Sequence, residues 1–198
     1  MSDFRQQSYD RYLSTFKATE DAAGDGTRNW AYYKYKYMRL LGDGGDIPRD
    51  VPVLDVGCGT GQIIQFLQKQ GFTAVEGVDL SGESVAKARS HGLKVEEGDA
   101  LAFLEAHPDS FGLIVALNFV EHFTRDELSR LFPAMFRALR KGGHVLIQTP
   151  NGSGLFPGQI MFDDLTHMTI FTPVSLDQSL RLAGFGDIRF TDTGPAPI

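Results

Sequence analysis

One stretch of this sequence has the residue types and spacing of a ligand-binding turn. Asp55 precedes glycines at three alternate positions, Gly57, Gly59 and Gly61, and a helical pattern follows directly. Alternate glycines free the turn of side-chain bulk, so the backbone can approach a ligand closely. The third glycine of a dinucleotide-binding turn would fall at position 62, which is Gln62. The spacing therefore favours a nucleoside ligand that has no pyrophosphate.

Two further acids stand where neighbouring strands are expected to end. Asp79 ends the second predicted strand and can accept both hydroxyls of a ribose, while Leu80 offers an apolar face to a base. Asp99 follows the third strand, where a carboxylate can accept the exocyclic amine of adenine. Either acid alone could equally be a helix cap. Taken in this order with the glycine turn, they favour a nucleoside site.

Four downstream side chains can carry a proton or orient a group that does: His122, Asp163, Asp164 and His167. His122 follows the fourth predicted strand, and a structural histidine packed under a ligand is the alternative interpretation. The other three lie in the stretch 150–173, which is too long for a simple connection. We expect this stretch to be a lid or a ligand-binding loop. Asp163, Asp164 and His167 could also bind a divalent cation, but we predict no metal.

Short apolar runs alternate with helical patterns from Val51 onward, which predicts an α/β fold with right-handed crossovers. The sheet is expected to be doubly wound, Rossmann-like and mostly parallel, with ligands at the carboxyl ends of the strands. The predicted strands are Val51–Val56, Ala74–Leu80, Leu93–Glu97, Leu113–Leu117, His144–Thr149 and Asp187–Thr191. The predicted helices are Gly61–Gln70, Glu83–His91, a third from a Thr124 capping box to about Leu139, and a fourth from Thr172 to Gly184.

Composition bounds the class of protein. The chain has 198 residues, 19 Lys and Arg against 25 Asp and Glu, a net charge of −6 and one cysteine. One cysteine excludes an internal disulfide framework, and an acidic chain disfavours a nucleic-acid partner. No apolar run approaches the length of a membrane span and no signal-peptide core is visible. We therefore predict a cytoplasmic protein without a membrane span.

The first 50 residues differ from the rest, so we predict a helical lid or cap at 1–50 and a ligand-binding domain at 51–198. Aromatic residues gather between Trp30 and Tyr37. They could form a helix that covers an edge of the core, or a lid whose rings face a ligand.

Three motifs together carry a family resemblance. Val53–Gly61 reads VLDVGCGTG, Gly77–Ser81 reads GVDLS and Glu97–Ala100 reads EGDA. This set resembles the S-adenosyl-L-methionine-binding motifs of class I methyltransferases, and the resemblance extends over about Val51 to Phe190.

Two later segments narrow the resemblance. Leu117–Phe123 (LNFVEHF) and His167–Pro173 (HMTIFTP) resemble the ubiquinone-biosynthesis type of small-molecule methyltransferase. The implied reaction moves a methyl group from S-adenosyl-L-methionine to an acceptor and leaves S-adenosyl-L-homocysteine. We expect a small-molecule acceptor and O-methylation, with a sugar, a lipid-linked glycan or a quinone-like phenol as candidate acceptors.

The resemblance also implies residue roles. The glycine turn would hold the methionine part of the cofactor, the second acid the ribose, the third acid the adenine, and backbone after the fourth strand the amino group. Cys58 is expected to occupy the glycine turn because it is small, and not to act as a nucleophile. The implied cofactor residues are Asp55, Gly57, Cys58, Gly59, Asp79, Leu80, Asp99, Ala100 and Leu117. The catalytic candidates are His167, His122 and Asp164, with His167 hypothesised to be the base and Asp163 or Asp164 to orient it.

Several alternatives remain open. N-methylation is disfavoured because no Asn/Asp-Pro-Pro-Tyr/Phe stretch follows the fourth strand, where the chain reads Asn118 to Glu121. An RNA or protein methyltransferase, a non-catalytic cofactor-binding regulatory module and a nicotinamide-dependent dehydrogenase are further rivals, the last disfavoured by Gln62.

The end of the chain carries a separate expectation. The family sheet has seven strands, with the last one antiparallel, and only seven residues, Asp192–Ile198, follow the sixth predicted strand. We therefore expect the final antiparallel strand to be absent or truncated. An uncovered edge invites pairing, which predicts either a homo-oligomer or a C-terminal continuation.

Overall fold

The computed structural model describes residues 3–11, 14, 34, 37 and 47–191. The chain divides into two compact units, one comprising Met1–Ala100 with Thr191–Ile198 and the other Leu101–Phe190. Most of the predicted 1–50 lid, including most of its aromatic run, lies outside the described residues. Tyr37 is described and is buried. Its ring and that of Phe66 are in an edge arrangement, with their centroids 6.4 Å apart. The domain boundary at residue 50 stays a prediction.

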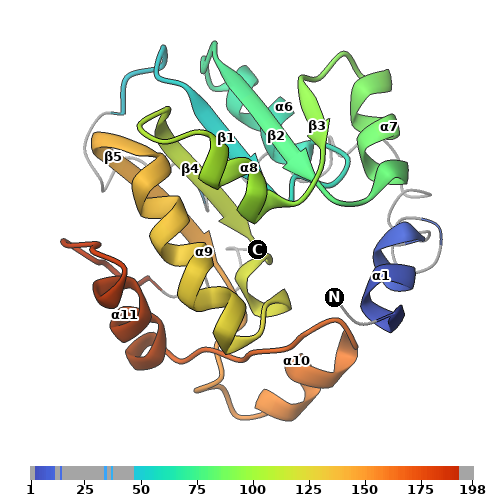
Figure 1. The fold of residues 1–198 in the computed structure, drawn as a ribbon, viewed down its shortest axis with the longest axis vertical. Coiled ribbons are helices and arrows are strands. Elements are labelled where there is room, and N and C mark those ends of the chain that lie inside the picture. The colour runs from blue at the N-terminus through green and yellow to red at the C-terminus, as the bar shows by residue number, and fades with distance from the viewer. Residues whose placement is uncertain (1–2, 12–13, 15–33, 35–36, 38–46, 192–198) are drawn as a thin grey trace. The chain divides into compact units, whose positions relative to one another are not determined.

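The first unit contains three parallel strands with short crossover helices (Figure 1). Strand β1 pairs with β2, and β2 pairs with β3, both in parallel register. All four residues of β1 are buried, as expected for a strand covered on both faces. Its elements are α1 (Asp3–Asp10), β1 (Val53–Val56), α6 (Gln62–Lys69), β2 (Val75–Asp79), α7 (Gly82–Ser90) and β3 (Val95–Glu97).

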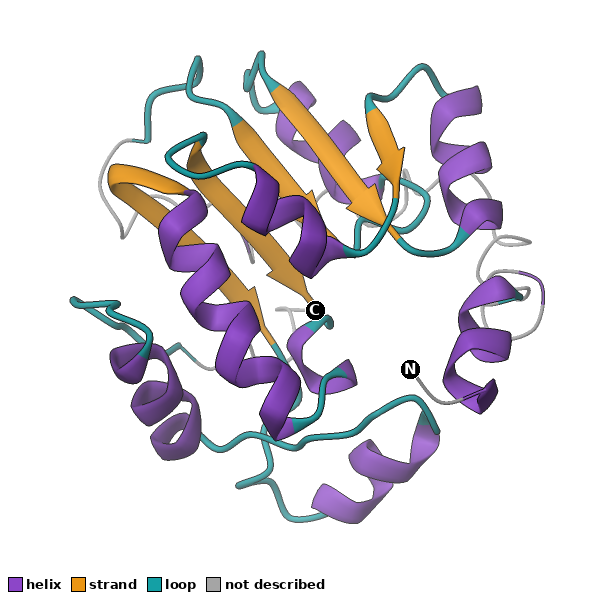
Figure 2. Ribbon diagram, in the orientation of Figure 1, coloured by secondary structure: helices purple, strands orange, loops and turns teal. Residues whose placement is uncertain are grey.

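The second unit pairs two long strands, β4 and β5, in parallel (Figure 2). The first six residues of β4 are buried. Its elements are α8 (Ala100–Ala106), β4 (Phe111–Leu117), the 3₁₀ turn η3 (Val120–His122), α9 (Arg125–Ala138), β5 (Leu139–Gln148), α10 (Pro157–Asp163) and α11 (Pro173–Leu182).

The first unit has the strand order β3-β2-β1, and in the second unit β4 lies beside β5. The predicted α/β class, with a Rossmann-like, mostly parallel sheet, is confirmed, and the described residues contain no antiparallel strand. No helix in the described part of the chain is long and apolar enough to cross a membrane. The predicted homo-oligomer stays a prediction.

Local capping chemistry fixes where two helices begin. The Thr124 amide donates to Glu127 Oε2 at 2.7 Å, and the Glu127 amide donates back to Thr124 Oγ1 at 3.3 Å. This reciprocal capping box satisfies free amides at the start of α9, as predicted. Thr172 and Ser175 form the equivalent box at the start of α11.

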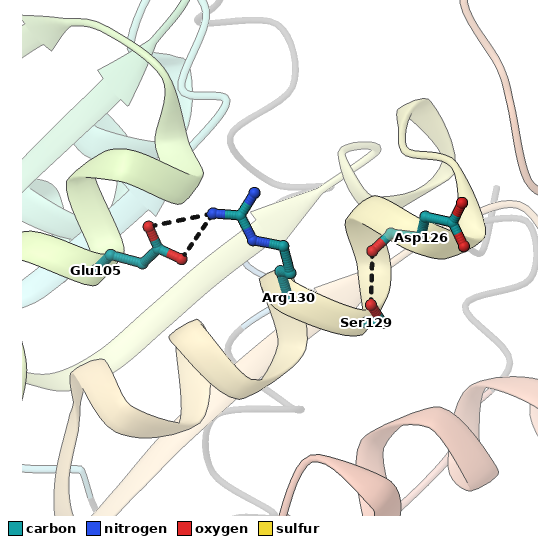
Figure 3. A network of polar contacts seen from close by, with 4 residues as sticks. All are labelled: Glu105, Asp126, Ser129 and Arg130. Carbon is teal, nitrogen blue, oxygen red and sulfur yellow. Dashed lines mark hydrogen bonds and ion pairs between the residues drawn. The ribbon is translucent and has the colours of Figure 1, made fainter.

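Helix α9 makes polar contacts on one side and buries apolar residues on the other. Arg130 on α9 pairs with Glu105 on α8 at 3.1 Å, and the Ser129 hydroxyl donates to the Asp126 carbonyl at 2.6 Å (Figure 3). Both partners of the ion pair are exposed, so it contributes little stability. The apolar face of α9 contributes more, since Leu131, Phe132 and Met135 are almost fully buried.

Four expectations about elements need correction. The predicted strand Asp187–Thr191 is wrong: these residues form no strand, and Phe190 is 45% exposed, so no buried face holds the segment extended. Helix α8 was not predicted, and α10 interrupts the predicted loop 150–173. Strand β5 begins at Leu139, five residues before the predicted start, through an irregular register beside Phe111.

Gly77 has no room for a side chain. A Cβ at Gly77 would lie 2.7 Å from both Cys58 Sγ and Ile64 Cδ1. Gly77→Ala is therefore expected to lower the free energy of unfolding by about 1–3 kcal/mol, the usual effect of overpacking. Chemical denaturation measures this. Gly98→Ala is the control, because no heavy atom lies within 4 Å of its Cβ position; equal effects of the two substitutions would contradict the packing explanation.

Candidate functional site

The glycine turn after β1 depends on backbone conformations that favour glycine. Gly57, Gly59 and Gly61 have φ angles of 67°, 52° and 83°, in the left-handed region that side chains disfavour. Gly61 also caps the start of α6. No heavy atom lies within 4 Å of a Cβ placed on Gly59. The turn is therefore open at Gly59, where a ligand could approach the backbone.

Asp79 joins this turn to the start of α7. Its Oδ2 accepts a hydrogen bond from the Gly59 amide at 2.7 Å, and its Oδ1 accepts one from the Ser81 amide at 2.8 Å. The Gly98 amide donates to the Asp79 carbonyl at 3.0 Å, which brings the turn after β3 to the same place. Asp79 thus holds three turns of the first unit together, and the ribose contact predicted for its carboxylate stays a prediction.

Asp55 is buried without compensation. It is 3% exposed, and its Oδ2 has no hydrogen-bond partner among the described residues. Burial, and next the nearby Asp79, raise the pKa of Asp55 well above its ordinary value. Burial and then Asp55 also raise the pKa of the Cys58 thiol, which is therefore protonated at neutral pH.

The remaining predicted cofactor residues take different positions. Asp99 is exposed and follows β3, while Ala100 is buried at the start of α8. Leu80 is half-buried directly after β2. The structure thus brings the turns carrying Gly59, Asp79 and Gly98 together in the first unit. Leu117 ends β4 in the second unit.

A tight turn follows β4 in the second unit. Asn118 has a φ of 49°, a left-handed conformation that asparagine tolerates. The Asn118 amide donates to the Gln148 carbonyl at 2.8 Å, and Gln148 Nε2 donates to Asn118 Oδ1 at 3.0 Å. The next turn, η3, carries Glu121 and His122, which are 2% and 8% exposed.

Glu121 connects three segments of this unit. Its Oε2 accepts a hydrogen bond from the Thr149 hydroxyl at 3.0 Å, and its carbonyl accepts from the amides of Met168 and Thr169 at 2.8 and 3.0 Å. Its Oε1 is buried without a hydrogen-bond partner among the described residues. Burial raises the pKa of Glu121 to about 7. Glu121 can therefore change charge near neutral pH.

His122 belongs to a buried hydrogen-bonded chain. Its Nδ1 lies 2.9 Å from Thr166 Oγ1, and Thr166 donates to Asp164 Oδ1 from both its hydroxyl and its amide, at 2.6 and 2.8 Å. Burial lowers the pKa of His122 to about 4, so its ring is neutral at pH 7. Burial acts to raise the pKa of Asp164, but the Thr166 hydrogen bonds and the nearby histidines lower it overall.

His167 is half-buried, and its ring centroid lies 5.0 Å from that of His122. The two acids predicted to orient it differ. Asp164 is buried and close enough to His167 for electrostatic interaction, whereas Asp163 is exposed at the end of α10. Of the two acids, only Asp164 is known to interact with His167 among the described residues, and the orienting role stays a prediction.

Three ligand atoms of this cluster, one each from Glu121, His122 and His167, lie within 4.8 Å of one another. Among the described residues, these three side chains could hold a metal ion. Only His167 also belongs to the metal site considered from the sequence, which comprised Asp163, Asp164 and His167. Glu121 was not among the residues predicted from the sequence, because its raised pKa depends on burial. The Glu-His pair after a strand was the signal available.

Comparison with known proteins identifies the family. A family model described as a methyltransferase domain matches residues 15–189. The chain belongs to this methyltransferase domain family. The family predicted from the sequence is therefore confirmed.

The methyltransferase domain has curated relatives that are longer than this chain. It is 33% identical over 107 residues to the ubiquinone biosynthesis O-methyltransferase of Sodalis glossinidius, a match that covers 50% of this chain and 41% of the relative. The protein of that name from Pseudomonas fluorescens is 34% identical over 105 residues, covering 50% and 44%. The chain thus spans less than half the length of these relatives.

Solved structures share the fold. A SAM dependent methyltransferase from Archaeoglobus fulgidus is similar with a TM-score of 0.71 and 24% identity, over 87% of this chain and 74% of that one. The [4+2]-cyclase SpnF is similar with a TM-score of 0.62 and 24% identity, over 81% and 61%. Because this fold also occurs in a protein described as a cyclase, the fold alone does not establish the reaction.

The raised pKa of Glu121 predicts a pH-dependent stability difference. Between pH 4.5, its ordinary value, and about 7 the folded protein keeps a proton that the unfolded chain has lost, so Glu121 lowers the free energy of unfolding as pH rises. Glu121→Gln removes this effect. The free energy of unfolding of the variant, relative to that of wild type, should rise as pH rises across this range. Above about pH 7 the rise should reach about 3 kcal/mol.

Denaturation at several pH values with a chelator present measures this gain. His122 has the opposite pH dependence, but it is present in both proteins and cancels in the difference. Glu96→Gln, at an exposed position of β3, is the control. A difference between Glu121→Gln and wild type that does not change with pH would contradict the assignment.

Proposed function

We propose that this protein transfers a methyl group from S-adenosyl-L-methionine to a hydroxyl group of a small molecule. The observation that carries the proposal is the Asp79 carboxylate, held by the Gly59 and Ser81 amides beside a glycine turn that is open at Gly59. The family, and the name of the curated O-methyltransferase relatives, support methyl transfer to oxygen.

In this proposal, the first unit holds the cofactor. Asp55, Gly57, Cys58 and Gly59 would take the methionine part, Asp79 and Leu80 the ribose and one face of the base, and Asp99 and Ala100 the adenine. The contact predicted from the sequence between the Leu117 backbone and the amino group stays a prediction. The buried Asp55 oxygen and the open position at Gly59 fit a ligand that brings a positive charge. When bound, S-adenosyl-L-methionine supplies an electrophilic methyl group on a sulfonium.

We further propose that His167 takes the proton of the acceptor hydroxyl. Its half-exposed ring can meet an acceptor, and the buried Asp164 would stabilise the imidazolium that forms. His122 stays neutral and holds the Thr166 turn in place. Deprotonation would raise the nucleophilicity of the oxygen, and alignment in a dry pocket would supply the rest.

We also propose that the reaction takes place in the cytoplasm, on a small-molecule acceptor. A net charge of −6 supports a small molecule over RNA. A regulatory module that binds the cofactor without turnover is the alternative from another class of function, and turnover separates the two.

The test measures S-adenosyl-L-homocysteine formation by the purified protein with a panel of phenols, sugars, amines and RNA. Turnover with hydroxyl acceptors is expected. Cofactor binding without turnover on any acceptor would support the regulatory module, and turnover confined to amines would contradict O-methylation.

His167→Ala tests the proposed base. We expect kcat to fall by about 10²–10⁴-fold with unchanged affinity for S-adenosyl-L-methionine, because proton removal is lost while the cofactor loops are intact. Asp163→Asn is the control, since Asp163 is exposed and outside the hydrogen-bonded cluster. A kcat for His167→Ala within a few-fold of wild type would refute the assignment.

A further inference from the structure

Two buried side-chain oxygens in the described residues have no hydrogen-bond partner, Asp55 Oδ2 and Glu121 Oε1. Glu121 lies in the cluster assigned to the acceptor. Asp55 lies two residues before Gly57, the first glycine of the turn that is assigned to the cofactor.

The described groups that interact electrostatically with Asp55 are acidic or neutral. Asp79 adds negative charge, and the Cys58 thiol stays protonated. Among the described residues, no lysine, arginine or histidine forms an ion pair with Asp55. An ionised carboxylate in such a place is strongly disfavoured unless a cation compensates it. The raised pKa of Asp55 agrees with this.

Protonating Asp79 in place of Asp55 would reduce the repulsion between the two acids, but it would cost hydrogen bonds. Both Asp79 oxygens already accept amide hydrogen bonds, from Gly59 and Ser81. A proton on Asp79 would weaken one of these bonds and loosen the turn. The proton is therefore better placed on Asp55.

We propose that Asp55 recognises the positive charge of the cofactor: it carries a proton in the free protein and releases it when the cationic methionine end binds. This inference rests on the proposed function, because it takes S-adenosyl-L-methionine as the ligand. The carboxylic acid becomes a carboxylate, the O–H bond breaks, and the proton goes to the buffer. The carboxylate is then compensated by the ligand cation.

The cofactor offers two cations of this kind, a sulfonium and an ammonium. If Asp55 faces the sulfonium, it distinguishes the cofactor from its product, because the product is an uncharged thioether that leaves Asp55 uncompensated. If Asp55 faces the ammonium, cofactor and product both cause proton release. In either case cofactor binding tightens as pH rises, until Asp55 ionises in the free protein.

Calorimetric titration of the full chain tests this. Binding enthalpies are measured at about pH 6, where the ligand amino group is already protonated, in two buffers of different ionisation enthalpy. The ligands are S-adenosyl-L-methionine with both cations, S-adenosyl-L-homocysteine with the ammonium alone, and methylthioadenosine with neither. We expect release of about one proton with the first and none with the third; the second identifies which cation is recognised.

Asp55→Asn should bind S-adenosyl-L-methionine without proton release and with an affinity that changes less with pH. Asp50→Asn, at an exposed position before β1, should behave like wild type. The wild-type series decides the question even if Asp55→Asn fails to fold. Binding of S-adenosyl-L-methionine with no proton exchange would overturn this inference and leave the proposed function standing. No binding at all would overturn the proposed function itself.

Discussion

The burial of acidic groups at the ends of strands is the constraint on which the site depends. Asp55 near the end of β1 and Glu121 after β4 each keep one oxygen away from water, and neither oxygen has a hydrogen-bond partner in the described part of the chain. Each such group costs on the order of 1–3 kcal/mol. A marginally stable chain keeps two of them only if the surrounding packing outweighs the cost. Strain of this type is typical of sites that bind or transform a ligand.

Rigid local structure supplies that support in each unit. In the first, Gly77 lets Cys58 and Ile64 pack closely beside β2, and Asp79 fixes two turns through amide hydrogen bonds. In the second, capping boxes set the starts of α9 and α11, and the Glu121 carbonyl holds the Met168 segment. Each unit thus holds a buried acid with an unpartnered oxygen on a fixed backbone among the described residues, which is what a preorganised electrostatic site needs.

Much of the first unit could be predicted because its signals are local. A buried strand, alternate glycines and an acid at the next strand end identify the turn without any tertiary information. The Thr124 and Thr172 caps are likewise encoded within four residues. The predicted sixth strand is wrong because a local pattern cannot show whether a face of the segment will be buried. Residues Asp187–Thr191 have no covering layer in the described part of the chain.

The second unit was harder to predict because its chemistry depends on burial. Glu121 and His122 are adjacent in sequence, whereas Asp164 lies far from both. Their hydrogen bonds nevertheless depend on two hydroxyls from other positions, those of Thr149 and Thr166. His167 was predicted to be the base from its residue type and its place in the stretch 150–173. It could not anticipate that burial brings the pKa of Glu121 to about 7 or that it makes His122 a weak base.

The state of Asp55 is the central claim, and carbon NMR of aspartate carboxyl groups reads it directly. In protein labelled at these carbons, the Asp55 signal should titrate well above the ordinary aspartate range near pH 4 in the free protein. With S-adenosyl-L-methionine bound, the same signal should be that of a carboxylate at neutral pH. An Asp55 signal that titrates near pH 4 in the free protein would contradict the claim.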